Sequence, residues 1–355
     1  MPRFENNILG FIPKTDWLDV GTLVTRPNDP VDQLIDDTKT DNLVAEWESL
    51  AAEYQIPIMA QFHGFDTEAQ TTVRFPIDSH NIEKGLIKVK INQSERLRAL
   101  IRNGVNNNSQ LYDYVIRDGV RLADQVVTRS KVAKNELLAT GKITIKENNL
   151  NITVDYGVPS ANTALTLDLS ASADIASQIQ TIVDNAKEKG KVITGMYTSG
   201  ATLTKMRNNT SLQKLINGNM GTGALLRNQS LRDFLADEFG LNTIITNDLT
   251  YGLPAKIGAN GRPQVPSKRY YPKDKVTFFS TNPAGRLARG LWGDPPEVDV
   301  ARFGNMDVSG ATNSPYVTIS QWTEKDPAVL WTKASALFMP VLFDPESLYV
   351  ATVSA

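Results

Sequence analysis

The stretch SQLYDYVIRDGVRLADQVVTRSKVAKNELLATG, residues 109–141, decides the fold of this chain. Its apolar side chains recur at helical spacing and form one stripe: Leu111, Val115, Leu122, Val126, Ala133 and Leu137. Ser109 is suited to cap the start of the helix, and Gly141 is the residue type that commonly follows a helix end. About 31 helical residues would extend roughly 46 Å, which is long for a globular helix. The pattern predicts a long helix with a sheet packed along one side.

The opposite face of this helix is charged, which excludes a membrane-spanning helix. It carries Arg117, Asp118, Arg121, Asp124, Arg129, Lys131 and Lys134. The whole chain of 355 residues is 41 % hydrophobic and 21 % charged, as in ordinary globular proteins, and is long enough for two domains. It has no cysteine, so disulfides, thiolate catalysis and zinc–thiolate sites are excluded. The net charge of −2 gives no overall attraction to nucleic acid.

The N-terminal segment, residues 1–40, lacks a regular pattern, and three prolines oppose a helix in it. Acidic residues dominate from 14 to 50: Asp16, Asp19, Asp29, Asp32, Asp36, Asp37, Asp41, Glu46 and Glu48. Two interpretations remain open, a disordered tail and an extended acidic arm that lies on another surface and contacts it through Trp17. An amphipathic helix is expected over 41–54, so residues 1–55 are assigned as an arm and a short helix.

Residues 56–92 have strand patterns at 56–62, 71–77 and 86–91 around a polar middle. They have too few apolar side chains to form a core of their own. We therefore expect either a two-stranded loop that projects from the body or an edge hairpin of a sheet. A basic run follows, with Lys84, Lys88, Lys90, Arg96, Arg98 and Arg102. This run is interpreted as a solvated face or as the partner of an acidic arm from a neighbouring chain.

The rest of the chain indicates an α+β fold. A hairpin is predicted over 143–156, and an α/β pattern of helices and strands fills 173–310. Strands are expected near 316–322, 329–339 and 347–353, with the 143–156 hairpin as their partner. A peripheral domain of 93–172 and 311–355, interrupted by an inserted α/β domain at 173–310, is the predicted organisation.

No group of residues in the sequence indicates an active site or a metal site. The two histidines, His63 and His80, both fall in the projecting loop, which is a poor scaffold for a relay or a metal site. The TGK at Thr140–Lys142 lacks the rest of a phosphate-binding loop, and GTGALL at 221–226 is interpreted as a flexible loop. Asp344 is interpreted as a turn residue. We therefore expect no enzymatic activity, no cofactor and no metal.

Three segments in order resemble the HK97-type major capsid proteins of tailed bacteriophages, most closely the lambda-like branch. They are LLATGKITIKENNLNITVDYG (137–157), VTFFSTNPAGRLARGLWG (276–293) and FMPVLFDPESLYVATVSA (338–355). The resemblance implies hexamers and pentamers that form an icosahedral shell around double-stranded DNA. It places the inserted domain around the capsomer axis and the loop over the neighbouring subunit. It also implies a virion location after assembly in the host cytoplasm.

The resemblance implies partners as well. They are copies of the chain, a portal, a decoration protein where one is present and packaged DNA contacted without sequence specificity, but no membrane. Because the chain passes from Met1 directly into the arm, a separate scaffolding protein is expected. Some members form Lys–Asn cross-links, but no asparagine is singled out here, so none is expected. The candidate inter-subunit contacts are Trp17, Phe62, Phe65, Phe75, Lys84, Lys88, Lys90, Arg96, Arg98 and Trp292.

Two alternatives belong to other classes of protein. One is the shell of a non-viral, encapsulin-like compartment, which would hold cargo enzyme rather than DNA. The other is a soluble α/β enzyme with residues 173–310 as its catalytic unit. The scarcity of histidine and the absence of cysteine count against the enzyme.

Overall fold

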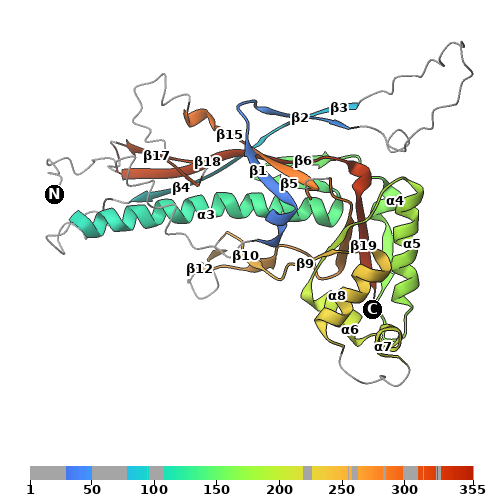
Figure 1. Cartoon of the computed structure of the whole chain (residues 1–355). Helices are drawn as coiled ribbons and strands as arrows, with labels where there is room; N and C mark the ends of the chain where they lie inside the picture. Colours follow the sequence, from blue (N-terminus) through green and yellow to red (C-terminus); the bar gives the residue numbers. More distant parts are fainter. Residues whose placement is uncertain are drawn as a thin grey trace, which may run out of the picture.

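A computed structural model describes most of the chain. The described residues are 29–49, 78–93, 95, 108–218, 226–254, 256–257, 263–282, 285–298, 311–314, 316–324, 326 and 329–354. Within them no helix combines the length and the apolar character needed to cross a membrane. The elements form a sheet-and-helix body and a second α/β unit at one end of it (Figure 1).

The long helix predicted from the apolar stripe is confirmed as α3, Asn108–Thr140. Leu122, Val126, Ala133 and Leu137 are buried along one side, as the periodicity requires. Gly141 ends the helix with φ +70°, and its N–H donates to the carbonyl of Leu137 at 2.8 Å. The charged face is less exposed than predicted, because Asp118 and Lys134 are both buried.

The body sheet packs on α3 and has the strand order β1-β15-β18-β17-β16 (Figure 1). Strand β18, Val329–Leu342, is its centre. On the edge opposite β17 it pairs first with β4, Gly85–Gln93, and then with β15. The remaining strands are β1 Ile35–Lys39, β15 Ala288–Gly293, β16 Ala311–Ser314 and β17 Val317–Glu324. The three C-terminal strands form as predicted, but their partners are not the 143–156 hairpin. Strands β17 and β18 pair with each other and with β16, β15 and β4. The strand at 348–354 joins a different sheet.

That hairpin is confirmed as a two-stranded sheet of its own, β5 Lys142–Glu147 and β6 Leu150–Asp155. Asn148 and Asn149 form its turn with φ +49° and +64°, the positive values that two-residue hairpins need. Only the inner end of the hairpin, at Ile143 and Val154, is buried against the body.

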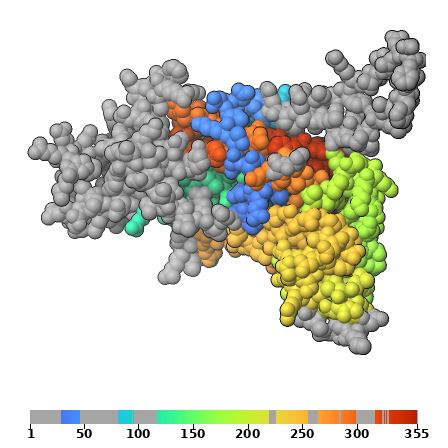
Figure 2. Space-filling view, in the orientation of Figure 1, coloured from blue at the N-terminus to red at the C-terminus, as the bar shows by residue number. Residues whose placement is uncertain are grey.

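The N-terminal prediction is corrected for residues 29–40, which belong to the body of the same chain. Pro30 begins a short 3-10 helix, η1 Pro30–Gln33, instead of preventing one, and β1 then pairs in parallel with β15. Val31, Leu34 and Ile35 are buried in the core. Figure 2 shows this segment, in blue, on the surface of the body beside the orange and red strands. Residues 1–28 lie outside the described residues.

The helix predicted over 41–54 is wrong for its described part. Residues Val44–Ser49 form strand β2, which pairs with β3, Asp78–Glu83. This β2–β3 ribbon leaves the body near the middle of the sheet and extends away from it (Figure 1). The strand predicted at 86–91 is β4 of the body sheet, so the limbs of the ribbon differ from those predicted. The strands predicted at 56–62 and 71–77 lie outside the described residues.

The second unit, which we call the axial unit after the position that the resemblance implies, is a five-stranded sheet with helices. Its strand order is β7-β19-β14-β8-β9. Two of these strands come from outside the segment predicted for this domain, β7 Leu165–Asp168 and the C-terminal β19 Leu348–Ser354. Strand β15 falls within the inserted domain predicted at 173–310 but lies in the body sheet. The other strands are β8 Gly195–Thr198, β9 Thr243–Thr246 and β14 Lys275–Phe279.

The helices and short elements complete the fold. The helices are α4 Ser160–Thr163, α5 Ile175–Glu188, α6 Gly200–Asn208, α7 Thr210–Asn217 and α8 Asn228–Phe239. Two small ribbons lie between β9 and β14: β10 Thr250–Gly252 with β13 Ser267–Arg269, and β11 Lys256–Ile257 with β12 Pro263–Gln264. Asp344 caps the 3-10 helix η4, Pro345–Ser347, by accepting from the N–H of Glu346, which confirms the predicted turn.

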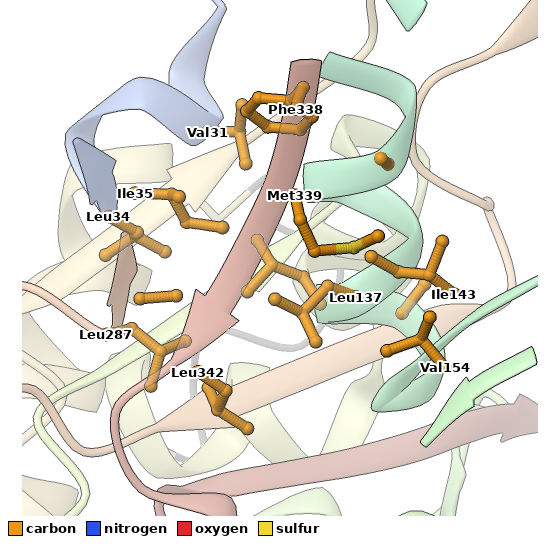
Figure 3. Close-up of a cluster of buried hydrophobic side chains, with 14 of the residues drawn as sticks. Val31, Leu34, Ile35, Leu137, Ile143, Val154, Leu287, Phe338, Met339 and Leu342 are labelled. Atoms are coloured by element: carbon orange, nitrogen blue, oxygen red, sulfur yellow. The ribbon is translucent and has the colours of Figure 1, made fainter. Parts of the chain in front are cut away.

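Hydrophobic side chains from distant segments meet between α3 and the body sheet (Figure 3). Leu137 of α3 lies near Ile143 and Val154 of the hairpin, with Met339 of β18 beside them, while Phe338 lies next to Val31. The N-terminal residues Val31, Leu34 and Ile35 close the same cluster (Figure 3). Burial of this apolar surface holds the segments together.

Candidate inter-subunit surfaces

Strand β4 exposes two of the lysines predicted as contacts. Its burial alternates along the strand, so that Ile87, Val89 and Ile91 face the core while Lys88 and Lys90 face outward. The outward face continues onto β18 and β17, because Lys90 pairs with Lys333 and Trp331 with Trp322. We call Lys88, Lys90, Trp322, Trp331 and Lys333 the outer sheet face.

Two tryptophans stack on the outer sheet face, with ring centroids of Trp322 and Trp331 6.1 Å apart. The Lys90 ammonium lies 4.1 Å from the Trp331 ring centroid, within the range of a cation–π interaction. Lys333 is paired with Glu297, which also accepts from Ser335. Burial alone would raise the pKa of Glu297, but the hydrogen bonds from Lys333 and Ser335 lower it overall. Lys88 and Lys90 therefore supply the available positive charge of this face.

Lys84, another predicted contact, is not at the surface. Its side chain is 2 % exposed, and its ammonium donates to Thr40 O at 3.0 Å, Thr40 Oγ1 at 2.6 Å and Trp292 O at 3.3 Å, and also to Asn42 O. Burial lowers the pKa of Lys84, although Asp41 and Asp294 partly oppose this. An ammonium enclosed in this way binds oxygens of its own chain. The prediction that Lys84 contacts a neighbouring subunit is therefore wrong.

Trp292 is likewise in the core, 1 % exposed. Its ring stacks on Tyr316 with centroids 5.2 Å apart and lies 4.6 Å from Phe338. A side chain covered by its own chain cannot contact a neighbour, so Trp292 is a core residue. The other predicted contacts lie outside the described residues: Trp17, Phe62, Phe65, Phe75, Arg96 and Arg98.

The acidic residues at 29–37 find partners within the chain. Asp32 pairs with Lys134 at 2.9 Å and Lys131 at 3.3 Å, and Asp37 pairs with Lys134 at 2.9 Å. Arg286 donates to the carbonyls of residues 32 and 33, at 3.2 and 2.7 Å. These ion pairs attach the N-terminal segment to the helix and sheet of its own chain.

A buried polar cluster joins the N-terminal segment, α3 and the axial unit. The Asn247 amide lies 3.0 Å from Asp29 Oδ1, 3.1 Å from Asn135 Oδ1 and 2.8 Å from Tyr197 Oη. Tyr197 donates in turn to Asn135 Oδ1 at 2.9 Å. Burial raises the pKa of Asp29, and burial together with Asp29 raises the pKa of Tyr197.

Sequence reasoning did not connect these four residues, which we call the junction. One signal was present, because Asn247 is a polar residue directly after the strand-forming segment Thr243–Thr246. The residues contacting it come from three other segments, and no local pattern links them. Among the described residues no group of His, Asp and Glu could hold a metal ion.

Comparison with known proteins identifies the class. Structures that resemble the chain include a phage-related protein from Bordetella bronchiseptica RB50, with TM-score 0.53, 10 % identity and 95 % of each chain covered. Mycobacterium phage Adephagia has a chain with TM-score 0.51 and 11 % identity, covering 100 % of this chain and 95 % of that one. At such identities the likeness concerns the fold, which is the HK97-like fold of phage capsids. No curated protein matches.

The family follows from the sequence itself. Residues 66–353 match the family model described as phage major capsid protein E, and the chain belongs to this family. It is a structural protein of a phage shell and a component of the virion capsid, which replaces the alternative of an α/β enzyme. Capsid proteins of this kind assemble into multimeric shells, so surfaces between copies are its functional sites.

Proposed function

We propose that copies of the chain form hexamers and pentamers of an icosahedral shell, assembled in the host cytoplasm around the double-stranded DNA of a tailed phage. The axial unit surrounds the capsomer axis, and the body runs along the capsomer edge. The β2–β3 ribbon, with residues 50–77 at its tip, lies over the neighbouring copy. Family membership and the ribbon's extension away from the body support this arrangement. The three motifs at 137–157, 276–293 and 338–355 support a place in the lambda-like branch.

We infer that neighbouring copies recognise each other through opposite charges. The ribbon with its tip, residues 44–83, contains seven carboxylate side chains and one arginine, a net charge of −6 with histidine neutral. Lys88 and Lys90 are exposed on the outer sheet face, while the acids at 29–37 are engaged within the chain. We therefore assign the ribbon and its tip, rather than the N-terminal segment, as the acidic partner of Lys88 and Lys90.

The strength of this pairing comes from repetition. An exposed ion pair contributes only about 0.2–1 kcal/mol and weakens with salt. Every copy in a shell would repeat the same pairs, so their sum biases assembly. Half-buried aromatic rings beside the lysines, Trp322 and Trp331, add apolar surface of the kind that contributes most to interfaces.

Further partners follow from the proposed shell. A scaffolding protein would guide its size, a portal would occupy one vertex, and a decoration protein, where present, would bind its outside. Packaged DNA would be contacted through its phosphates without sequence specificity. The net charge of −2 requires such contacts to be local.

Charge reversal tests the proposed pairing. Lys88→Glu with Lys90→Glu should slow shell formation and remove its dependence on salt, and Glu46→Lys with Glu48→Lys should do the same. A variant that combines all four changes should recover part of the rate. The matched control is Lys146→Glu with Lys214→Glu, which changes the net charge equally at two other exposed lysines. If the variant at Lys88 and Lys90 and the control at Lys146 and Lys214 slow assembly equally, the outer sheet face is not the basic partner of the ribbon.

A further inference from the structure

Lys84 stands where the β2–β3 ribbon leaves the body. It is the single residue between β3, which ends at Glu83, and β4, which begins at Gly85. The other limb passes the same point between the end of β1 at Lys39 and the start of β2 at Val44. Both limbs therefore change from body to ribbon within reach of one side chain.

The Lys84 ammonium joins three segments at this point. Its acceptors are two backbone carbonyls of the outgoing limb, at Thr40 and Asn42, the Thr40 hydroxyl, and the carbonyl of Trp292 on β15. Backbone bonds reinforce the arrangement: Lys84 N–H donates to Leu43 O at 3.0 Å, and Thr40 N–H donates to Trp292 O at 2.8 Å. Without the ammonium, these buried oxygens would lose their shared hydrogen-bond donor.

Gly293 makes room for this ammonium. A Cβ atom at residue 293 would lie 3.1 Å from Lys84 Nζ and 3.3 Å from Leu337 Cβ. Among the described residues, no carboxylate forms an ion pair with Lys84. The charge is held by oxygens of the two limbs and β15, so moving a limb would leave a buried ammonium short of acceptors. Such a loss costs more than losing an exposed ion pair.

We propose that Lys84 is a positioning residue for assembly, and that its ammonium fixes the direction in which the β2–β3 ribbon extends toward the neighbouring copy. This inference rests on the proposed role of the ribbon between copies. Its physical basis is preorganisation: a ribbon already held in the productive direction loses less conformational freedom when it docks. Lys84 thus acts without touching the neighbour.

The test compares Lys84→Met with Lys146→Met, a control at an exposed lysine of β5. Lys84→Met keeps an unbranched side chain, one atom shorter, and removes the charge and the donor. In the unassembled full-length chain, we expect amide hydrogen exchange to rise roughly tenfold in residues 40–49 and 78–84 and to stay unchanged in β5 and β6. Shell formation should slow by a similar factor, and the control should match the natural chain in both measurements.

Two further variants keep the test decisive if Lys84→Met fails to fold. Thr40→Val removes one acceptor, and Gly293→Ala presses on the ammonium while leaving the charge in place. Each should raise exchange in the same limbs and slow assembly. Unchanged exchange in the limbs, or faster exchange with normal shell formation, would overturn the inference. Failure of the proposed function looks different, since the natural chain itself would form no shells.

Discussion

The side-chain amide of Asn247 donates a hydrogen bond across 3.0 Å to the carboxylate of Asp29, and both side chains are buried. Asp29 belongs to the N-terminal segment, while Asn247 follows β9 of the axial unit. The same amide reaches Asn135 of α3 and Tyr197 of β8. One side chain thus links the N-terminal segment, the long helix and the axial unit.

Replacing Asn247 with leucine should destabilise the subunit. The substitution leaves the buried Asp29 carboxylate and the Asn135 carbonyl without this donor, and each unsatisfied group costs about 1–3 kcal/mol. We expect a loss of roughly 2–4 kcal/mol in the free energy of unfolding, measured by urea denaturation of the unassembled chain. Asn151→Leu, at an exposed position of β6, is the control. Equal stability of the two variants would show that the junction contributes nothing.

The raised pKa of Asp29 should make the stability of the folded chain depend on pH. Burial raises its pKa in the folded chain above the value of 3.8 expected when unfolded. The folded state therefore binds this proton more tightly, so the contribution of Asp29 to stability is complete below pH 3.8 and declines as pH rises through its folded pKa. Asp29→Asn keeps an oxygen acceptor for Val31 N–H and Asn247 but removes the titration. The stability of this variant relative to the natural chain should increase from about pH 4 to about pH 7.

Urea denaturation of both chains across that pH range checks the sign. A difference that stays constant with pH would mean that Asp29 titrates at its ordinary value. A difference that falls toward neutral pH would mean that the carboxylate is stabilised by Lys131 and Lys134 more strongly than burial opposes it.

Lys134 should be critical for attaching the N-terminal segment. Its buried ammonium lies 2.9 Å from Asp32 and 2.9 Å from Asp37, and burial already raises the pKa of Asp37. Lys134→Met leaves Asp37 without its counter-charge, and removing one partner of a buried pair costs about 3–5 kcal/mol. We expect the free energy of unfolding to fall by an amount near the lower end of this range, because Asp32 is partly exposed to water.

Two comparisons make the Lys134 measurement specific. Lys187→Met breaks an exposed pair with Asp184 and should change the unfolding free energy by less than about 0.5 kcal/mol. Lys134→Met combined with Asp37→Asn should recover part of the loss, since no buried charge then remains unpaired. A double variant as unstable as the single one would show that packing, not charge, accounts for the effect.

Local pattern was enough to predict the elements whose stability is local. The stripe from Leu122 to Leu137 and the terminal Gly141 specify α3, and the Asn148–Asn149 turn specifies the hairpin. Residues 41–54 misled the prediction because Leu43, Val44 and Trp47 fit helical spacing. The segment is a strand since residues 78–83 pair with it, and strand preference depends on such distant partners.

The candidate sites were harder to predict for the same reason. Lys84 appeared as one lysine in a basic run, but its acceptors lie at Thr40 and at Trp292, which is 208 residues away. Asp32 appeared as part of an acidic arm, yet its partner Lys134 is 102 residues away. Only alternation along β4 identified exposed lysines correctly, because period two is a local property of a strand.

Removing the ribbon tip should separate folding from assembly. Residues 50–77 join the far ends of β2 and β3, where Ser49 pairs with Asp78. Replacing them with a short Gly/Ser turn leaves both strands and Lys84 in place. The variant should unfold cooperatively, with stability close to that of the natural chain, and should form no closed shells. A variant that cannot fold would make the tip part of the core, and normal shells would make it dispensable.

Electron microscopy of the purified full-length chain, together with its mass in solution, tests whether copies of the chain assemble with one another. We predict closed shells, tubes or capsomer rings, because proteins of this family assemble into shells and the acidic ribbon is proposed to pair with the outer sheet face of a neighbouring copy. A chain that stays monodisperse at its monomer mass of 39.1 kDa, at every salt concentration tested, would contradict it.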